Sequence, residues 1–283
     1  MRKLFFGKER EERLRNVERQ ALRMERRVRS LLRMVLHERF SGTGLEAPGF
    51  DPFPGSLHSE NNEDGITLRV FSEIGVLRHS FLEIGIQDGL ECNAAILALA
   101  FGWHGVLMDG DPEWVRSAKA NYAQCPGVAV RQAFVTRENI NELVGAPDVD
   151  RDSDLFSLDI DGNEYWVWKA LSDFRPRLAI IEFNQGFGFD RSVTIPYDPN
   201  FVHRAKTPRG YLGSSLPALL KLGREKGYVL VGVTVRNAFF VRESEMKGRL
   251  RELSLAEARN CLPPQPSAEK RARDFEGWPL EEV

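Results

Sequence analysis

The chain has 283 residues, of which 42% are hydrophobic, so it can bury the core of one large domain with an appendage. Residues 1–40 contain thirteen Lys or Arg against six Glu, whereas the remainder is acidic, which argues against nucleic acid as the main partner because phosphate binding needs a basic surface. Three scattered cysteines, no apolar run long enough to cross a membrane and no apolar signal segment favour a cytoplasmic location.

Residues 9–38 lack proline and glycine and are rich in helix formers. Their apolar side chains recur in steps of three and four over three heptads, at Leu14, Val17, Ala21, Met24, Val28, Leu31 and Val35. This pattern predicts that residues 1–40 form a basic amphipathic helical arm, a coiled coil through which the chain forms a homo-oligomer. Peripheral membrane contact and packing of the arm on the acidic body remain open as alternatives. Residues 41–59, with four glycines and three prolines, are expected to form a linker.

The segment 60–260 alternates between strand-like and helix-like patterns. Strands are predicted near residues 80–84, 104–109, 128–135, 154–159, 177–183, 228–234 and 237–242, and helices near 63–75, 90–101, 112–123, 138–144, 163–173 and 214–226. This alternation is typical of a parallel sheet with helices on both faces. The last two strands are joined by a tight turn and must therefore be antiparallel. The tail, residues 261–283, is expected to be irregular, with Trp278 as its possible anchor.

A glycine-containing turn follows the first predicted strand. Glu83, Gly85, Asp88 and Gly89 lie at this strand-to-helix junction, and Asp109 ends the next strand. Glycines there allow backbone to approach a ligand closely, and Asp109 is placed to accept hydrogen bonds from a ribose diol. The two motifs together predict a site for a nucleoside-bearing cofactor.

The spacing of this turn differs from the G-x-G-x-x-G of dinucleotide-binding folds, because Glu83 stands where the first glycine would be. Glu83 and Asp88 would repel a pyrophosphate but suit a cationic ligand. S-adenosyl-L-methionine, which carries a sulfonium and an ammonium group, meets this requirement. The alternative interpretation is an acidic cap at an ordinary strand-to-helix turn.

The stretch from about residue 61 to 242 resembles the FkbM-like branch of S-adenosylmethionine-dependent methyltransferases. The matching blocks include Phe-Leu-Glu-Ile-Gly at 81–85 and Leu-Met-Asp-Gly-Asp-Pro at 107–112, and the full set is 61–66, 81–93, 102–112, 155–168, 175–184, 211–216 and 237–241. Asn62 and Asp109 depart from the residues usual in the family. The resemblance implies a class I methyltransferase-like (Rossmann-like), mostly parallel seven-stranded sheet with helices on both faces, closed by one antiparallel strand.

Acidic residues gather where the fourth and fifth predicted strands end. Asp159 and Asp161 follow the fourth strand, and Glu182 and Asn184 end the fifth. A hydroxyl acceptor must lose its proton, either to a base such as Asp161 or Glu182 or with help from a metal. Asp159, Asp161 and Glu182, joined by the Asn184 amide, offer hard oxygen ligands for Mg²⁺ or Mn²⁺. Asp159 is also a candidate cofactor contact, and the alternative for the acids is helix capping.

A long polar loop at residues 185–210 follows the fifth strand and contains His203, a further candidate base. We expect this loop to bind the acceptor, Ser214 or Ser215 to cap the next helix, and Tyr165, Trp166 and Trp168 to pack in the core. Trp114 is a weaker candidate for contact with the adenine. The predicted reaction is methylation of a hydroxyl on a sugar or glycan-type acceptor.

Two rival functions remain open. A nucleotide-sugar-dependent glycosyltransferase could use the D-x-D of Asp159 and Asp161, although no basic cluster accompanies it. The chain could also be a non-catalytic methyltransferase-like scaffold. The cofactor motif is intact, which argues against a chain that has lost its catalytic function. Its residues are Glu83, Gly85, Gly89 and Asp109.

Overall fold

A computed structural model describes residues 58–59, 61–203, 207, 210–248, 250–264 and 267–283. The predicted arm at residues 1–40 and nearly all of the linker at 41–59 lie outside these residues, so the coiled coil stays a prediction. Within the described part of the chain, no helix has the length and apolar character needed to cross a membrane.

Seven strands form the central sheet in the order β3-β2-β1-β4-β5-β8-β7. Their bounds are β1 (Ser80–Ile84), β2 (His104–Asp109), β3 (Val128–Gln132), β4 (Leu155–Leu158), β5 (Leu178–Glu182), β7 (Tyr228–Val233) and β8 (Asn237–Arg242). The first five strands are mutually parallel, and β8 runs antiparallel to both β5 and β7. This is the class I methyltransferase-like, Rossmann-like arrangement, and the predicted fold class is confirmed.

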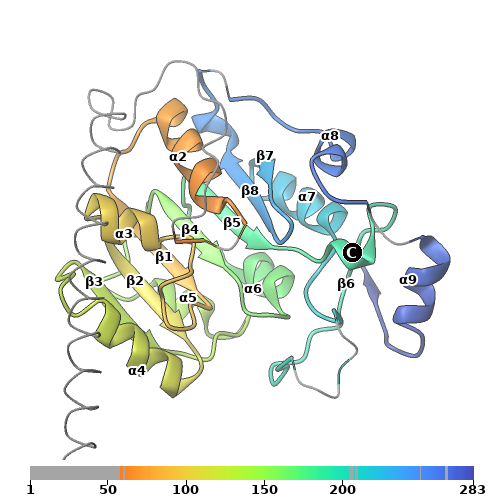
Figure 1. The fold of residues 1–283 in the computed structure, drawn as a ribbon, viewed down its shortest axis with the longest axis horizontal. Coiled ribbons are helices and arrows are strands. Elements are labelled where there is room, and N and C mark those ends of the chain that lie inside the picture. The colour runs from red at the N-terminus through yellow and green to blue at the C-terminus, as the bar shows by residue number, and fades with distance from the viewer. Residues whose placement is uncertain (1–57, 60, 204–206, 208–209, 249, 265–266) are drawn as a thin grey trace, which may run out of the picture.

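Helices cover both faces of this sheet (Figure 1). They are α2 (Glu63–Ile74), α3 (Ala95–Phe101), α4 (Pro112–Asn121), α5 (Ile140–Val144), α6 (Glu164–Ala170), α7 (Leu216–Glu225) and α8 (Leu255–Asn260). Strand side chains alternate between two apolar cores, so that Phe81 packs with α2 and α3 while Leu82 packs with α6 and α7. The predicted helices and strands are confirmed, with most ends shortened by a few residues.

The described residues of the C-terminal tail include a helix and a strand, so the prediction of an irregular segment at 261–283 is wrong. It contains α9 (Ala268–Asp274) and β9 (Glu281–Glu282), which pairs with β6 (Val193–Thr194). Figure 1 shows α9 beside β6, far from β3 at the opposite edge of the sheet. Two aromatic side chains of the tail pack against the loop after β5. The ring centroid of Trp278 lies 4.9 Å from that of Tyr211, and the centroid of Phe275 lies 5.0 Å from that of Phe187.

The sheet changes direction of winding between β1 and β4. The connection after β1 leads to α3 on one face, and the connection after β4 leads to α6 on the other. The two connections therefore separate at the carboxyl ends of adjacent strands and leave a crevice there. In open α/β sheets, ligands bind in a crevice of this kind.

Candidate functional site

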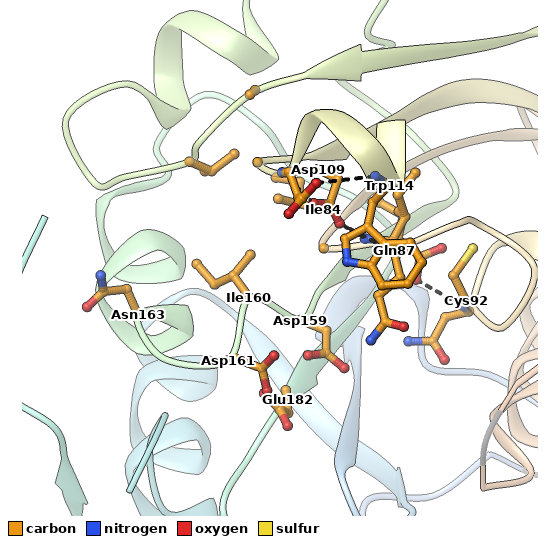
Figure 2. Close-up of a pocket in the computed structure, with 18 of the residues that line it drawn as sticks. Ile84, Gln87, Cys92, Asp109, Trp114, Asp159, Ile160, Asp161, Asn163 and Glu182 are labelled. Atoms are coloured by element: carbon orange, nitrogen blue, oxygen red, sulfur yellow. Dashed lines mark hydrogen bonds between the residues drawn. The ribbon is translucent and has the colours of Figure 1, made fainter. Parts of the chain in front are cut away.

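A cavity of about 650 Å³ opens at the carboxyl ends of β1, β2, β4 and β5. The loop after β1, the start of α4 and the turns after β3 and β4 supply most of its lining. Figure 2 shows Asp109, Gln87 and Trp114 close together on one side and Asp159, Asp161 and Glu182 gathered on another. The structure thus brings the two predicted motifs to one cavity.

Gly85 holds the loop after β1 against the end of β4. Its φ is +85°, and a Cβ at this position would lie 1.4 Å from the backbone carbonyl oxygen of Asp159. Only glycine can occupy such a position, because any side chain would collide with backbone in an unfavourable conformation. Gly85 therefore sets the distance between the first and fourth strands at the cavity floor.

Glu83 lines the cavity, but both of its carboxylate oxygens bind backbone. Oε1 accepts a hydrogen bond from the Asn93 N–H at 2.8 Å, and Oε2 accepts one from the Ala94 N–H at 2.7 Å. Burial raises the pKa of this carboxyl group, and the two backbone hydrogen bonds oppose that effect. Glu83 thus fixes the turn before α3, in agreement with the alternative interpretation of an acidic cap.

Asp88 and Gly89 are not among the residues that line the cavity, so the structure does not support them as cofactor contacts. The Asp88 Oδ1 accepts a hydrogen bond from the Leu90 N–H at 3.0 Å. Gly89 has φ +76°, and a Cβ there would lie 2.7 Å from the ring of Tyr122. Its small size serves the packing of the loop on α4. Of the four residues predicted at this turn, Glu83 and Gly85 line the cavity.

Asp109 lines the cavity at the end of β2, as predicted. Its Oδ2 accepts hydrogen bonds from the N–H groups of Ile86 and Gln87 at 3.0 and 2.8 Å, and its Oδ1 accepts one from Asp111 at 2.8 Å. A carboxylate has about four acceptor positions, so capacity for a further donor remains. Asp109 therefore orders the loop after β1 in addition to facing the cavity.

Two exposed aromatic side chains line the cavity next to Asp109. Trp114 at the start of α4 is 44% exposed, and Phe134 after β3 is 49% exposed. Large apolar side chains usually bury most of their surface, so exposed aromatic rings in one cavity indicate a place for a flat apolar ligand group. Trp114 was a weak candidate from the sequence, and Phe134 was not predicted.

Asp159, Asp161 and Glu182 converge, as predicted. One carboxylate oxygen from each lies within 4.8 Å of those of the other two. Figure 2 shows these three side chains together at the cavity wall. Asp161 adopts φ +55°, a conformation that is uncommon for a residue other than glycine. Backbone strain of this kind often accompanies a functional site.

A fourth carboxyl group, that of Glu164, adds to the negative charge of this cluster. Glu164 accepts hydrogen bonds from the N–H groups of Ile160 and Gly162 through Oε1, while its buried Oε2 has no hydrogen-bond partner. The Glu182 Oε2 is likewise buried without a partner. Buried acceptors of this kind are costly unless a donor or a cation satisfies them.

The carboxyl groups perturb one another. Loss of hydration and the nearby Glu164 and Asp161 raise the pKa of Asp159 to about 8. Burial and the neighbouring Asp159 raise the pKa of Glu182 well above its ordinary value. Burial raises the pKa of Glu164 to about 7. The cluster therefore retains protons at neutral pH unless a cation replaces them.

The lining of the cavity is strongly acidic. Among the described residues that line it, eight carry a carboxyl group and one, Arg236, carries a cation. Arg236 lies 3.6 Å from the Glu182 Oε1. Away from Arg236, such a lining repels a pyrophosphate and attracts a positively charged ligand.

Two candidate site residues in the segment after β5 lie outside the cavity lining. Asn184 is not among the lining residues, and its amide donates to the carbonyl oxygens of Gly210 and Leu212 and accepts from the Gly186 N–H. His203 is exposed and is not among the lining residues, so the structure does not place it as a base. Part of the loop forms β6. Among the described residues of this loop, Phe201 and Val202 line the cavity, and residues 204–206 and 208–209 lie outside the described part of the chain.

Two further sequence predictions near the site are confirmed. Tyr165, Trp166 and Trp168 are buried in the core. The Ser215 side chain accepts a hydrogen bond from the Ala218 N–H and caps α7.

Sequence reasoning missed Glu164 and Arg236. Glu164 was assigned only to a helix, although it follows Asp161 by three residues. Arg236 lies in the tight turn between β7 and β8. Because β7 runs in the same direction as β5, this turn had to lie at the carboxyl edge of the sheet. The predicted topology therefore contained the signal for Arg236.

No family model and no curated protein sequence matches the chain. Similar solved structures include a candidate caffeoyl-CoA O-methyltransferase from Staphylococcus aureus (15% identity, 76% of this chain and 98% of that chain, TM-score 0.42). A Methanococcus jannaschii fibrillarin pre-rRNA processing protein has 10% identity, and the match covers 70% of this chain and 86% of that chain with a TM-score of 0.41. An Aquifex aeolicus SAM-dependent methyltransferase has 15% identity, with 68% and 97% covered and a TM-score of 0.39. The fold is assigned from the strand order and not from these likenesses.

Proposed function

We propose that this chain is an S-adenosylmethionine-dependent methyltransferase. The observation that carries the proposal is the acidic cavity at the winding reversal of the sheet, with eight carboxyl groups and one cation among its described lining residues. A sulfonium and an ammonium group suit this charge, whereas a diphosphate does not. The ordered motif blocks support a narrower proposal, that the chain belongs to the FkbM-like branch.

The two sides of the cavity suit the two halves of the cofactor. Asp109 retains acceptor capacity for a ribose diol, and Trp114 and Phe134 supply exposed aromatic surface for a base. Gly85 allows close approach of backbone at the floor. We assign the methionine half to the neighbouring stretch, where Asp159 extends from the end of β4.

The acceptor group is proposed to be a hydroxyl on a sugar or glycan-type molecule. S-adenosylmethionine supplies an electrophilic methyl group, so the protein mainly has to position the acceptor in line with it. The hydroxyl must also lose its proton. We propose Asp161 and Glu182 as its acceptors. The raised pKa of Glu182 makes its ionised form the stronger base, which can act only in the fraction of molecules where Glu182 has lost its own proton or a cation has displaced it.

A divalent cation fits the same cluster. Asp159, Asp161 and Glu182 offer three hard oxygen ligands, and the buried Glu182 Oε2 lacks a hydrogen-bond partner. Mg²⁺ or Mn²⁺ held by these residues would lower the pKa of the acceptor hydroxyl. The cation is part of the proposal, and base catalysis by the carboxylates alone is the alternative.

A comparison of ligands by thermal shift tests the proposed function against its rivals. S-adenosylhomocysteine should raise the melting temperature, whereas UDP, GDP and NAD should not. A ligand at a hundredfold excess over its Kd stabilises the folded protein by about 2.7 kcal/mol. Stabilisation by UDP or GDP alone would favour a glycosyltransferase, and no response to any of the four would favour a non-catalytic scaffold.

A further inference from the structure

Arg236 occupies a special place in the cavity. It lies in the turn between β7 and β8, and its backbone carbonyl oxygen accepts a hydrogen bond of 2.7 Å from the Phe183 N–H, just after β5. This contact fixes the backbone of the turn beside Glu182, the last residue of β5. The guanidinium therefore reaches the cavity next to the carboxylate cluster.

The guanidinium of Arg236 is largely uncommitted. Its Nη1 lies 3.6 Å from the Glu182 Oε1, beyond the usual hydrogen-bond length, and the side chain is 54% exposed. Its five N–H donors make no hydrogen bond to the residues that the structure describes. Opposite charge alone explains why it faces the cluster, but not why its donors are left open to the cavity.

Arg177 shows what a structural arginine looks like in this chain. Its side chain is 3% exposed, and it donates to Asp154, Glu245 and the carbonyl oxygens of Ile74 and Gly75. All of these contacts are between 2.7 and 3.1 Å. Arg236 has neither the burial nor the hydrogen bonds of such a residue.

We infer that Arg236 binds an anionic group of the acceptor and so determines its class: a hydroxylated molecule that carries a carboxylate or a phosphate. This inference rests on the proposed function. A planar guanidinium matches both groups through two parallel hydrogen bonds of about 2.7–2.9 Å. Because the Arg236 Nη1 lies 3.6 Å from the Glu182 Oε1, the bound anionic group would lie beside the carboxylate proposed to accept the hydroxyl proton.

The apolar part of the cavity fits the rest of such an acceptor. Phe201 and Val202 line the cavity. Phe201 packs on Gly162, where a Cβ would lie 2.3 Å from its ring. A ring with one apolar face, hydroxyls on its edge and one anionic substituent combines all three features. Uronic acids and sugar phosphates belong to this class.

Matched probes test the inference. D-glucuronate, glucose 6-phosphate and methyl glucoside are each titrated calorimetrically into the protein saturated with S-adenosylhomocysteine, and each is assayed for methyl transfer from S-adenosylmethionine. The variants are Arg236→Gln, Arg236→Lys and the control Arg251→Gln, an exposed arginine paired with Glu257. The two anionic probes distinguish a carboxylate from a phosphate.

We expect wild type to bind at least one anionic probe at least tenfold more tightly than methyl glucoside. Arg236→Gln should weaken that binding about 10–100-fold and raise KM with little change in kcat, as for loss of a charged hydrogen bond. Arg236→Gln should change the affinity for methyl glucoside by no more than about twofold. Arg236→Lys should recover part of the lost affinity for the anionic probe, and Arg251→Gln should bind all probes as wild type does.

Equal loss for neutral and anionic probes would overturn the inference, because Arg236 would then serve only to neutralise the acidic cluster. Failure of both anionic probes to bind wild type would overturn it as well. Failure of S-adenosylhomocysteine itself to bind would instead refute the proposed function, so the two failures are distinguishable.

Discussion

Replacement of Gly85 by alanine should destabilise the fold and impair the site together. The added Cβ would lie 1.4 Å from the Asp159 carbonyl oxygen and 2.5 Å from its carbonyl carbon, so one of the two backbone segments must move. The positive φ of Gly85 costs an L-residue about 1–2 kcal/mol. Forcing an extra methyl group into packed surroundings costs about 1–3 kcal/mol more. We therefore expect the free energy of unfolding to fall by about 2–5 kcal/mol.

Gly102 provides the matched control. Its φ is +71°, and a Cβ there would have nothing within 4 Å. Gly102→Ala should therefore pay only for the backbone conformation, about 1–2 kcal/mol. Urea unfolding of both variants measures the difference, which isolates the collision with Asp159. Equal destabilisation by the two substitutions would refute the proposed contact between the first and fourth strands.

Three further predictions concern the turn before α3, the carboxylate cluster and the arm. Glu83→Gln keeps one acceptor oxygen but loses one of the two hydrogen bonds from backbone, so the free energy of unfolding should fall by about 1.5–3 kcal/mol. An unchanged melting temperature would argue against the capping role of Glu83. If a metal assists catalysis, EDTA should abolish methyl transfer and Mg²⁺ or Mn²⁺ should restore it. Asp161→Asn should then weaken the binding of Mn²⁺ measured by calorimetry. Activity that resists EDTA would refute the metal and leave base catalysis by the carboxylates as the explanation. Deletion of residues 1–40 should lower the mass measured by light scattering without loss of S-adenosylhomocysteine binding, and equal masses would rule out the arm as the oligomerising segment, with vesicle co-sedimentation then testing membrane contact.

The order of strands and helices could be predicted because each element has its own local pattern. The apolar runs of the predicted strands correspond to strands of the structure, with small changes at their ends. The antiparallel hairpin followed from a turn too short for a crossover. The tail could not be predicted in this way, because β9 has two residues and forms only where β6 is presented to it.

The sequence predicted the site residues correctly where a residue's position at the end of a strand determines where its side chain lies. Asp109, Asp159 and Glu182 lie at strand ends, so their meeting at one edge follows from parallel pairing. The prediction failed where the orientation of a side chain depends on its hydrogen-bond partners. Asp88 turns to its own loop, and the Asn184 amide is taken by the carbonyl oxygens of Gly210 and Leu212. Such partners come from distant segments and leave no local signal in the sequence.

The most direct test of the account is a calorimetric titration of S-adenosylhomocysteine into wild type and Asp109→Ala. Wild type should bind one molecule per chain. Because Asp109 supplies the proposed acceptor for the ribose and also orders Ile86 and Gln87, its loss should weaken binding by about 1.5–3 kcal/mol, or roughly 10–150-fold. Absence of binding to wild type, or equal affinity in the variant, would contradict the assignment of this cavity to S-adenosylmethionine.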